Sequence, residues 1–286
     1  MLNEVIKKFK AWSLVPALFA TGFVIPGCSS ESESAKGARL LYEQAEALNQ
    51  AGSPQDAILI LDSLKKAFPA ETKWQRAAMK LRPNLILGDS ERAINSINDS
   101  ISMLESVYNE LLPRMKKVSD ARLVEPYYTA ASVYNPSFME TTGIQPRVSD
   151  IGQFYLVSSV NGLGLKHTGM TLSGGGESAT AGPVPFDGEM NYRINGGEVI
   201  TYSPEQSEAI GALAARHPEE AMTVTLTGGK NKNLKLSSKD VRAIADCYNF
   251  SRSIVEARQL AFERERLNRQ VEIARSQNER LNSQEQ

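Results

Sequence analysis

Histidine is the side chain best suited to act as a base or metal ligand near neutral pH, and this chain has two, His167 and His217. Neither has a cysteine or a second histidine beside it. The sequence also lacks the His-x-x-x-His, Cys-x-x-Cys, Gly-x-Ser-x-Gly and Gly-Lys-Ser/Thr patterns of metal, nucleophile and phosphate sites. We therefore expect no metal or cofactor, and structural or solvent-facing roles for both histidines.

Three acidic residues and a glycine-rich run remain as candidates for chemistry. Hydrolysis of a glycosidic bond needs two carboxylates within reach of that bond, and Asp187 with Glu189, or Glu198, are the acids considered for it. The glycine-rich run 173–178 lies among expected strands and no lysine follows it. A loop between strands is therefore favoured over a phosphate cradle.

The two cysteines differ in context. Cys247 falls within a helical pattern with no histidine nearby, which favours a small buried side chain over a nucleophile. Cys28 follows a start that carries three lysines and then an uncharged apolar run over residues 11–25. Such a start is typical of a secretory signal peptide, and the run is shorter than the roughly 20 residues that a membrane-spanning helix needs.

Residues 25–30 read Ile-Pro-Gly-Cys-Ser-Ser and resemble the lipobox of bacterial lipoprotein precursors. The resemblance implies cleavage before Cys28, a diacylglycerol on its thiol and an acyl chain such as palmitate on the new amine. At roughly 0.8 kcal/mol per buried CH₂, several acyl chains form a durable anchor. Ser29 in place of aspartate implies the outer membrane, with the periplasmic and surface faces both open. An ordinary signal peptide followed by an unmodified cysteine is the alternative.

Charge and composition narrow the classes of partner. The 286-residue chain has a net charge of −1, and loss of residues 1–27 would leave −3. This balance argues against a nucleic-acid partner, while 41% hydrophobic residues suffice for a globular core. Residues 28–37 carry no large apolar side chain and predict a flexible tether.

Residues 38–88 are expected to be helical, and their first part resembles one tetratricopeptide (TPR) unit. With Pro69 as the closing proline, Ala45 and Ala57 fall where the motif needs small residues, and Gly52 falls at its turn. Leu64 stands where the motif usually has glycine or alanine. Repeats of this kind need about three stacked copies for stability, and a following helix over 73–87 would add one layer. Both a helical support and a recognition groove are compatible with this segment.

Two further segments, 89–119 and 238–286, predict long helices. The first repeats apolar side chains at alternating steps of three and four, namely Ile94, Ile97, Ile101, Leu104, Tyr108, Leu111 and Met115. The second would be near 70 Å long at about 1.5 Å per residue, and its thinly apolar last third projects, pairs weakly or frays. We expect the first helix to pair antiparallel with the first half of the second. A homodimer through the same seam is the alternative.

Between these helices, residues 150–237 predict an antiparallel β-domain, either sandwich or barrel, with one short helix beginning at Ser203-Pro204. Glycine turns at 195–197 and 228–229 separate alternating segments, which is typical of hairpins. The connecting segment 120–149 holds the partner-binding candidates Tyr127, Tyr128, Tyr134 and Phe138. These aromatic residues either cover the β-domain core or present anchors to a partner.

The sequence thus predicts an α+β chain with N-terminal TPR-like helices and two long heptad helices flanking an antiparallel β-domain. The expected function is that of a non-catalytic envelope lipoprotein that docks or braces protein partners at the outer membrane. Its expected partners are the lipid bilayer, through acylated Cys28, and envelope proteins. The alternatives are glycan or peptide binding by the β-domain and a carboxylate-dependent hydrolase of cell wall or polysaccharide.

Overall fold

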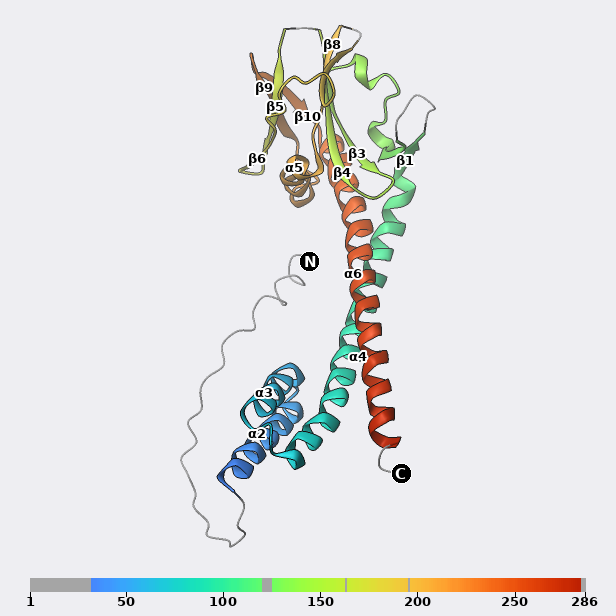
Figure 1. The fold of residues 1–286 in the computed structure, drawn as a ribbon. Helices are drawn as coiled ribbons and strands as arrows, with labels where there is room; N and C mark the ends of the chain where they lie inside the picture. Colours follow the sequence, from blue (N-terminus) through green and yellow to red (C-terminus); the bar gives the residue numbers. More distant parts are fainter. Residues whose placement is uncertain (1–31, 120–124, 163, 195, 284–286) are drawn as a thin grey trace.

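The computed structural model describes residues 32–119, 125–162, 164–194 and 196–283. They form a small helical base, a stalk of two long helices and a β-sandwich at the far end of the stalk (Figure 1). The predicted α+β chain, with long helices flanking antiparallel β-structure, is confirmed. The predicted lipidation residue, Cys28, lies outside the described residues.

The base consists of α2 (Glu33–Gln50), α3 (Pro54–Ala67) and the first turns of α4 (Thr72–Leu111). The tether predicted over 28–37 is too long, because the Ser32 side chain accepts a hydrogen bond from the Ala35 amide and helix begins at Glu33. Gly52 turns the chain between α2 and α3 with a φ of +80°. The buried core of the base comprises Ala45, Ala57, Leu61, Leu64, Ala78 and Leu85.

A single 40-residue helix, α4, replaces the two helices that the sequence predicted over 73–87 and from residue 90. It continues through Pro83, which is buried. A proline removes one intrahelical hydrogen bond, and the burial of Pro83 itself and of Leu85 offsets that loss. Pro113 coincides with the end of this helix, since α4 ends at Leu111 and a 3-10 turn over Leu112–Arg114 follows. The helix therefore does not reach residue 119 as predicted.

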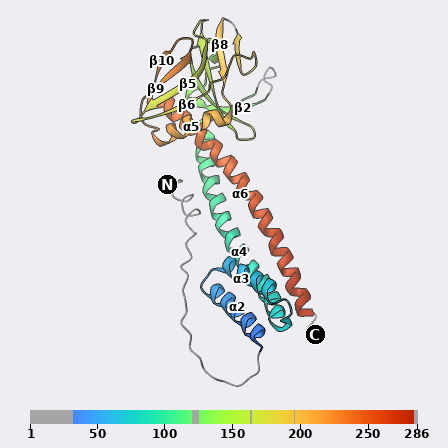
Figure 2. The ribbon, with the colours of Figure 1, turned by 60° about the vertical axis from the view of Figure 1, so that its left-hand side comes forward.

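The stalk is an antiparallel pair formed by α4 and α6 (Ser238–Ser283), as Figures 1 and 2 show. Arg264 hydrogen-bonds to Asn98, and Asn278 hydrogen-bonds to Asn84, so residue numbers rise along one helix as they fall along the other. The predicted antiparallel pairing is confirmed. The last third of α6 does not project, because Leu267, Val271 and Ala274 are buried. The pairing therefore extends over far more than the first half of α6.

The register of the stalk can be tested with cysteine pairs in a Cys28→Ser background. The side chains of Asn84 and Asn278 are 2.8 Å apart, so cysteines at these two positions should be joined within one chain by a short thiol crosslinker. A pair at Ile97 and Val255 is the control. Arg264 reaches Asn98, so residue 265 lies opposite Ile97 and Val255 is out of register by ten residues, or roughly 15 Å along the helix. Equal crosslinking of both pairs, or links only between chains, would contradict this register.

The sandwich consists of two antiparallel sheets, which decides between the predicted sandwich and barrel. The six-stranded sheet has the order β1 (Met115–Val118), β2 (Tyr127–Ala130), β3 (Gly143–Ser149), β4 (Phe154–Asn161), β8 (Gly197–Thr201), β7 (Asn191–Ile194). The four-stranded sheet has the order β10 (Lys232–Leu236), β9 (Met222–Gly228), β5 (His167–Gly174), β6 (Glu177–Ala181). The β-domain begins at residue 115 and not at 150 as predicted. Its first three strands escaped prediction because β1 is short with two lysines and β3 contains Pro146.

The predicted hairpins form between β7 and β8 and between β9 and β10. The glycine-rich run 173–178 is the turn of a third hairpin, β5–β6, in which Gly175 and Gly176 both have positive φ. Strands β4 and β5 do not pair with each other, because the chain crosses from one sheet to the other between them. The short helix α5 (Pro204–Arg216) begins at Ser203 with a capping box, as its sequence predicts.

The first turns of α6 join the stalk to the sandwich and complete the sandwich core. Phe250 of α6 stacks on Tyr108 of α4 with 5.1 Å between ring centroids, and it also contacts Tyr128 of β2. Because these rings tie both stalk helices to the six-stranded sheet, the stalk and the sandwich share one buried core. Among the described residues, no helix combines the length and the apolar character needed to cross a membrane.

Candidate functional site

A buried polar network joins the two sheets at the place where the chain crosses between them. Ser158 of β4 and Glu198 of β8 belong to the six-stranded sheet, and His167 begins β5 of the other sheet. The Nε2 atom of His167 lies 2.9 Å from the Ser158 hydroxyl, and its Nδ1 atom lies 3.1 Å from a Glu198 carboxylate oxygen. Each of the three residues is at most 2% exposed.

The direction of these hydrogen bonds follows from the charges. Burial lowers the pKa of His167 more than the neighbouring Glu198 raises it, so the imidazole is neutral at neutral pH. Nδ1–H then donates to the carboxylate, Nε2 accepts from the Ser158 hydroxyl, and the Tyr202 hydroxyl donates to Ser158. Burial also raises the pKa of Tyr202 to about 12, which keeps its proton in place.

Glu198 holds the crossover loop as well as the histidine. Its two carboxylate oxygens accept from the backbone N–H groups of Gly164, Lys166 and His167 at 2.9 to 3.0 Å. Burial alone would raise the pKa of Glu198, but these backbone donors and the His167 side chain lower it to about 2. Lys166 has a φ of +50°, which is rare for a residue with a side chain, and the flanking hydrogen bonds hold it there.

The order serine–histidine–acid is that of a hydrolytic triad, in which the histidine would take the proton from the serine as its oxygen attacks a substrate. Attack requires that a substrate atom reach Ser158, whose exposed fraction is zero. Ser158, His167 and Glu198 line neither the two hollows along the stalk nor the two at the start of α6. In this structure the three side chains join the two sheets and the crossover loop.

The other acids considered for hydrolysis lie apart from this network. Asp187 accepts from the backbone N–H groups of Glu189, Met190 and Asn191, and these donors hold the pKa of its carboxyl below the usual value. It thus caps a turn before β7, and Glu189 is exposed in the same turn. Their roles here are those of turn residues.

The remaining histidine and cysteine also have structural surroundings. His217 lies at the end of α5 on the surface, where the hydrogen bonds that its ring donates to the Glu177 and Glu220 carboxylates raise its pKa. Cys247 is fully buried in α6, and burial raises the pKa of its thiol, which suppresses the reactive thiolate. Among the residues that the structure describes, no cluster of histidine, cysteine and acid side chains could hold a metal ion.

The four aromatic candidates for partner binding divide by burial. Tyr127 and Phe138 are each 7% exposed, whereas Tyr128 and Tyr134 are half-buried. Lys117 lies over the Tyr128 ring and Lys116 lies over the Tyr134 ring. The burial of Tyr127 and Phe138 favours the covering role over the presenting role for those two residues.

Sequence reasoning missed a cluster around Arg147 on the outer face of the six-stranded sheet. The Arg147 guanidinium stacks on the Tyr127 ring at 4.2 Å, and its Nε–H donates to Gln145. Tyr155 and Tyr192 are the half-buried neighbours of this face, and burial raises the pKa of both phenols. The sequence did not predict β3 as a strand because it contains Pro146. Arg147 could therefore not be assigned to this face from the sequence.

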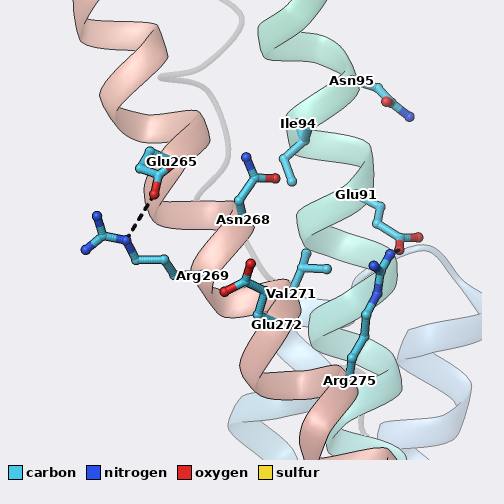
Figure 3. A pocket seen from close by; sticks show the side chains of 9 residues that line it. All are labelled: Glu91, Ile94, Asn95, Glu265, Asn268, Arg269, Val271, Glu272 and Arg275. Atoms are coloured by element: carbon cyan, nitrogen blue, oxygen red, sulfur yellow. Dashed lines mark hydrogen bonds and ion pairs between the residues drawn. The ribbon is translucent and has the colours of Figure 1, made fainter.

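Hollows that could receive a partner lie along the stalk. A groove of about 410 Å³ lies between α4 and α6. In Figure 3, Ile94 of α4 points toward Asn268 and Val271 of α6, which also line this groove. Arg275 of α6 donates a hydrogen bond to Glu91 of α4, so charged groups line the rim of this groove. A second groove, of about 490 Å³, lies where α3, α4 and α6 meet, and it is lined by the exposed side chains of Leu59 and Ile273.

Two more hollows flank the start of α6 on the sandwich. One of about 380 Å³ lies between β10, β3 and the first turns of α6. Its neighbour of about 360 Å³ is lined by Arg114, Lys239, Arg242 and Asp246. These hollows are surface features suited to a polypeptide chain more than to an enclosed small molecule.

Comparisons with known protein families, with curated proteins and with solved structures found nothing that matches this chain.

Proposed function

We propose that this chain is a non-catalytic, lipid-anchored envelope protein whose stalk holds a β-sandwich away from the outer membrane for docking to protein partners. The observation that carries the proposal is the antiparallel pairing of α4 with α6. At about 1.5 Å per residue, the 40 residues of α4 extend over roughly 60 Å. A fully paired stalk of this length serves separation and not the closure of a compact core.

The position of the lipobox-like cysteine gives the stalk a direction. Cys28 precedes Ser32, the cap of α2, by four residues, and four residues span at most about 14 Å. A lipid on Cys28 would therefore hold the base at the membrane surface. The sandwich, at the other end of the stalk, would then face partners beyond it.

Two buried alanines support the proposal that the base is a TPR-like unit. Ala45 of α2 and Ala57 of α3 are both fully buried, as expected where two helices approach closely. The first turns of α4 add Ala78 and Leu85 to the same core. We propose that this unit supports the stalk, because one unit and a further helix offer little of the extended surface of a repeat array.

A second candidate function, glycan or peptide binding by the β-domain, is favoured by the cluster on the outer face of the six-stranded sheet. Tyr155, Tyr192 and Arg147 supply ring faces and a planar cation, which are common at sites for sugars and peptides. The burial of Arg147 argues against ready access to that cation.

The anchoring half of the proposal is tested by replacing Cys28 with serine. We expect the Cys28→Ser variant to remain an uncut precursor without acyl label and to leave the outer-membrane fraction, whereas Ser29→Ala, the matched neighbour, is processed normally. Metabolic labelling with palmitate, gel mobility and membrane fractionation measure these outcomes. Normal processing and membrane retention of Cys28→Ser would remove the lipid anchor from the proposal.

The docking half is tested by photocrosslinking in intact envelopes. A photoreactive residue on the sandwich at Lys235 should capture envelope proteins, while the same residue at Lys65 on the base should capture lipid or fewer proteins. Capture patterns that are the same at both positions would contradict a docking role for the sandwich.

A further inference from the structure

The edge strand β10 leaves a row of backbone groups open. It is the last strand of the four-stranded sheet, and it pairs with β9 on one side only. In the described part of the chain no strand pairs with its other side. Alternate residues of an edge strand direct their N–H and C=O groups outward, so β10 can accept one more strand.

A groove lined by both apolar and polar side chains, Asp240 among them, runs beside this open edge. It is the 380 Å³ hollow at the start of α6, and Leu234, Ile144 and Ile244 contribute apolar side chains to it from β10, β3 and α6. Val133 and Pro146 extend the apolar lining. A strand added to β10 would direct every second side chain toward this groove. The incoming segment therefore needs apolar residues at alternate positions.

The charges around the edge are mostly positive. Lys232 and Lys235 of β10 and Lys239 of α6 are exposed, and no described carboxylate lies within ion-pair distance of them. The adjoining hollow adds Arg114 and Arg242, although these two already pair with Asp246 and Glu219. The free lysines complement acidic groups on a partner.

The edge strand at the far side of the other sheet is less open to such a partner. In β1, Lys116 and Lys117 fold over the rings of Tyr134 and Tyr128. Exposed lysines on a four-residue edge strand are a common protection against strand addition.

We propose that β10 receives an extended acidic segment of a partner protein, which adds a strand to the four-stranded sheet and places alternate apolar side chains in the adjacent groove. Main-chain hydrogen bonds give affinity in this mode of recognition, and the groove and lysines give specificity. The proposal rests on the proposed docking function and names its surface.

The probe is a fluorescent synthetic peptide of about eight residues, the length of a short strand, in which valine and glutamate alternate. The protein is the full mature chain with Cys28→Ser. We expect a dissociation constant below about 1 mM, and we expect it to rise at least about tenfold with Lys235→Glu. Lys65→Glu, the same charge change on the base, should leave binding unchanged. The same peptide with lysine in place of glutamate should bind at least about tenfold more weakly.

Backbone pairing is tested on the peptide, which avoids any risk to the fold. Two versions carry N-methyl groups on alternate residues, one on each edge of the bound strand. Strand addition requires that one version lose binding and the other retain it, because only one edge faces β10. Loss by neither version would overturn strand addition.

Several results would overturn the proposal as a whole. These are no binding up to about 1 mM, equal binding of the lysine peptide, or no effect of Lys235→Glu. A concentration-dependent dimer in sedimentation that Lys235→Glu abolishes would replace the acidic partner with a second copy of this chain. If the peptide fails while photocrosslinking at Lys235 still captures envelope proteins, the docking function stands and the partner does not bind β10 as an added acidic strand.

Discussion

Replacing Glu198 with alanine is expected to lower the free energy of unfolding by about 3–5 kcal/mol, because it removes the acceptor of several hydrogen-bond donors at once. The variant would leave three backbone N–H groups and the His167 side chain without their acceptor. Each buried donor left unpaired costs about 1–3 kcal/mol. Urea unfolding followed by circular dichroism measures the change.

Glu189 supplies the matched control for this loss. It is an exposed glutamate in the turn that precedes β7, and Glu189→Ala should change stability by less than about 0.5 kcal/mol. Glu198→Gln should fall between the two, because the amide keeps one oxygen acceptor but turns two donors toward other donors. A loss below about 1 kcal/mol in Glu198→Ala would show that water replaces the carboxylate without cost, and the network would not brace the sheets.

The same network predicts that acid destabilises the fold in two steps. The folded pKa of His167 is below its ordinary value of 6.5, so stability declines as the pH falls below about 6.5, where only the unfolded chain takes up that proton. The folded pKa of Glu198 is about 2 against an ordinary value of 4.5, so its contribution is present above pH 4.5 and is lost as the pH falls from 4.5 toward 2. Glu198→Gln should lack the second step.

The sequence predicted the elements with strong local signals and missed those defined by long-range contacts. The capping box at Ser203, the hairpin turns and the heptad spacing of α4 each lie within a few residues, and each forms as expected. Strand β1 has no alternation of apolar and polar residues. It pairs with β2 because the end of α4 places it beside that strand. Pairing partners that are distant in sequence leave no such local signature.

In the candidate sites too, residue type could be read from the sequence, whereas long-range contacts could not. His167 and Glu198 were each singled out by residue type, but they lie 31 positions apart and only the packing of two sheets brings them together. Ser158 gave a weak signal, since a serine in the middle of the apolar strand β4 needs a buried partner. The open edge of β10 could not be foreseen, because a hairpin reveals which strands pair and not which edge stays free.

The stalk depends on burial along one face of α4, and Leu104→Asp should therefore be strongly destabilising. Leu104 is 7% exposed on α4, whereas its neighbour Met103 is 58% exposed. Successive residues of a helix point about 100° apart, so the two positions differ in environment but not in helical context. Loss of a buried leucine costs about 2–5 kcal/mol, and an aspartate in the same place adds the cost of burying a charge.

We expect Leu104→Asp to lower the free energy of unfolding by about 3–5 kcal/mol and Met103→Asp to change it by less than about 1 kcal/mol. Hydrogen exchange should show where the loss falls. Amides in the last third of α6, around Leu267 and Val271, should exchange much faster in Leu104→Asp, because this segment is held mainly by α4. Amides of β4 and β8 should stay protected, since the core that the sandwich shares with the adjoining ends of the stalk helices does not include Leu104. Equal effects of the two variants, or exchange that rises first in the sandwich, would show that the seam of α4 does not hold the stalk together, and the separation of base from sandwich would need another cause.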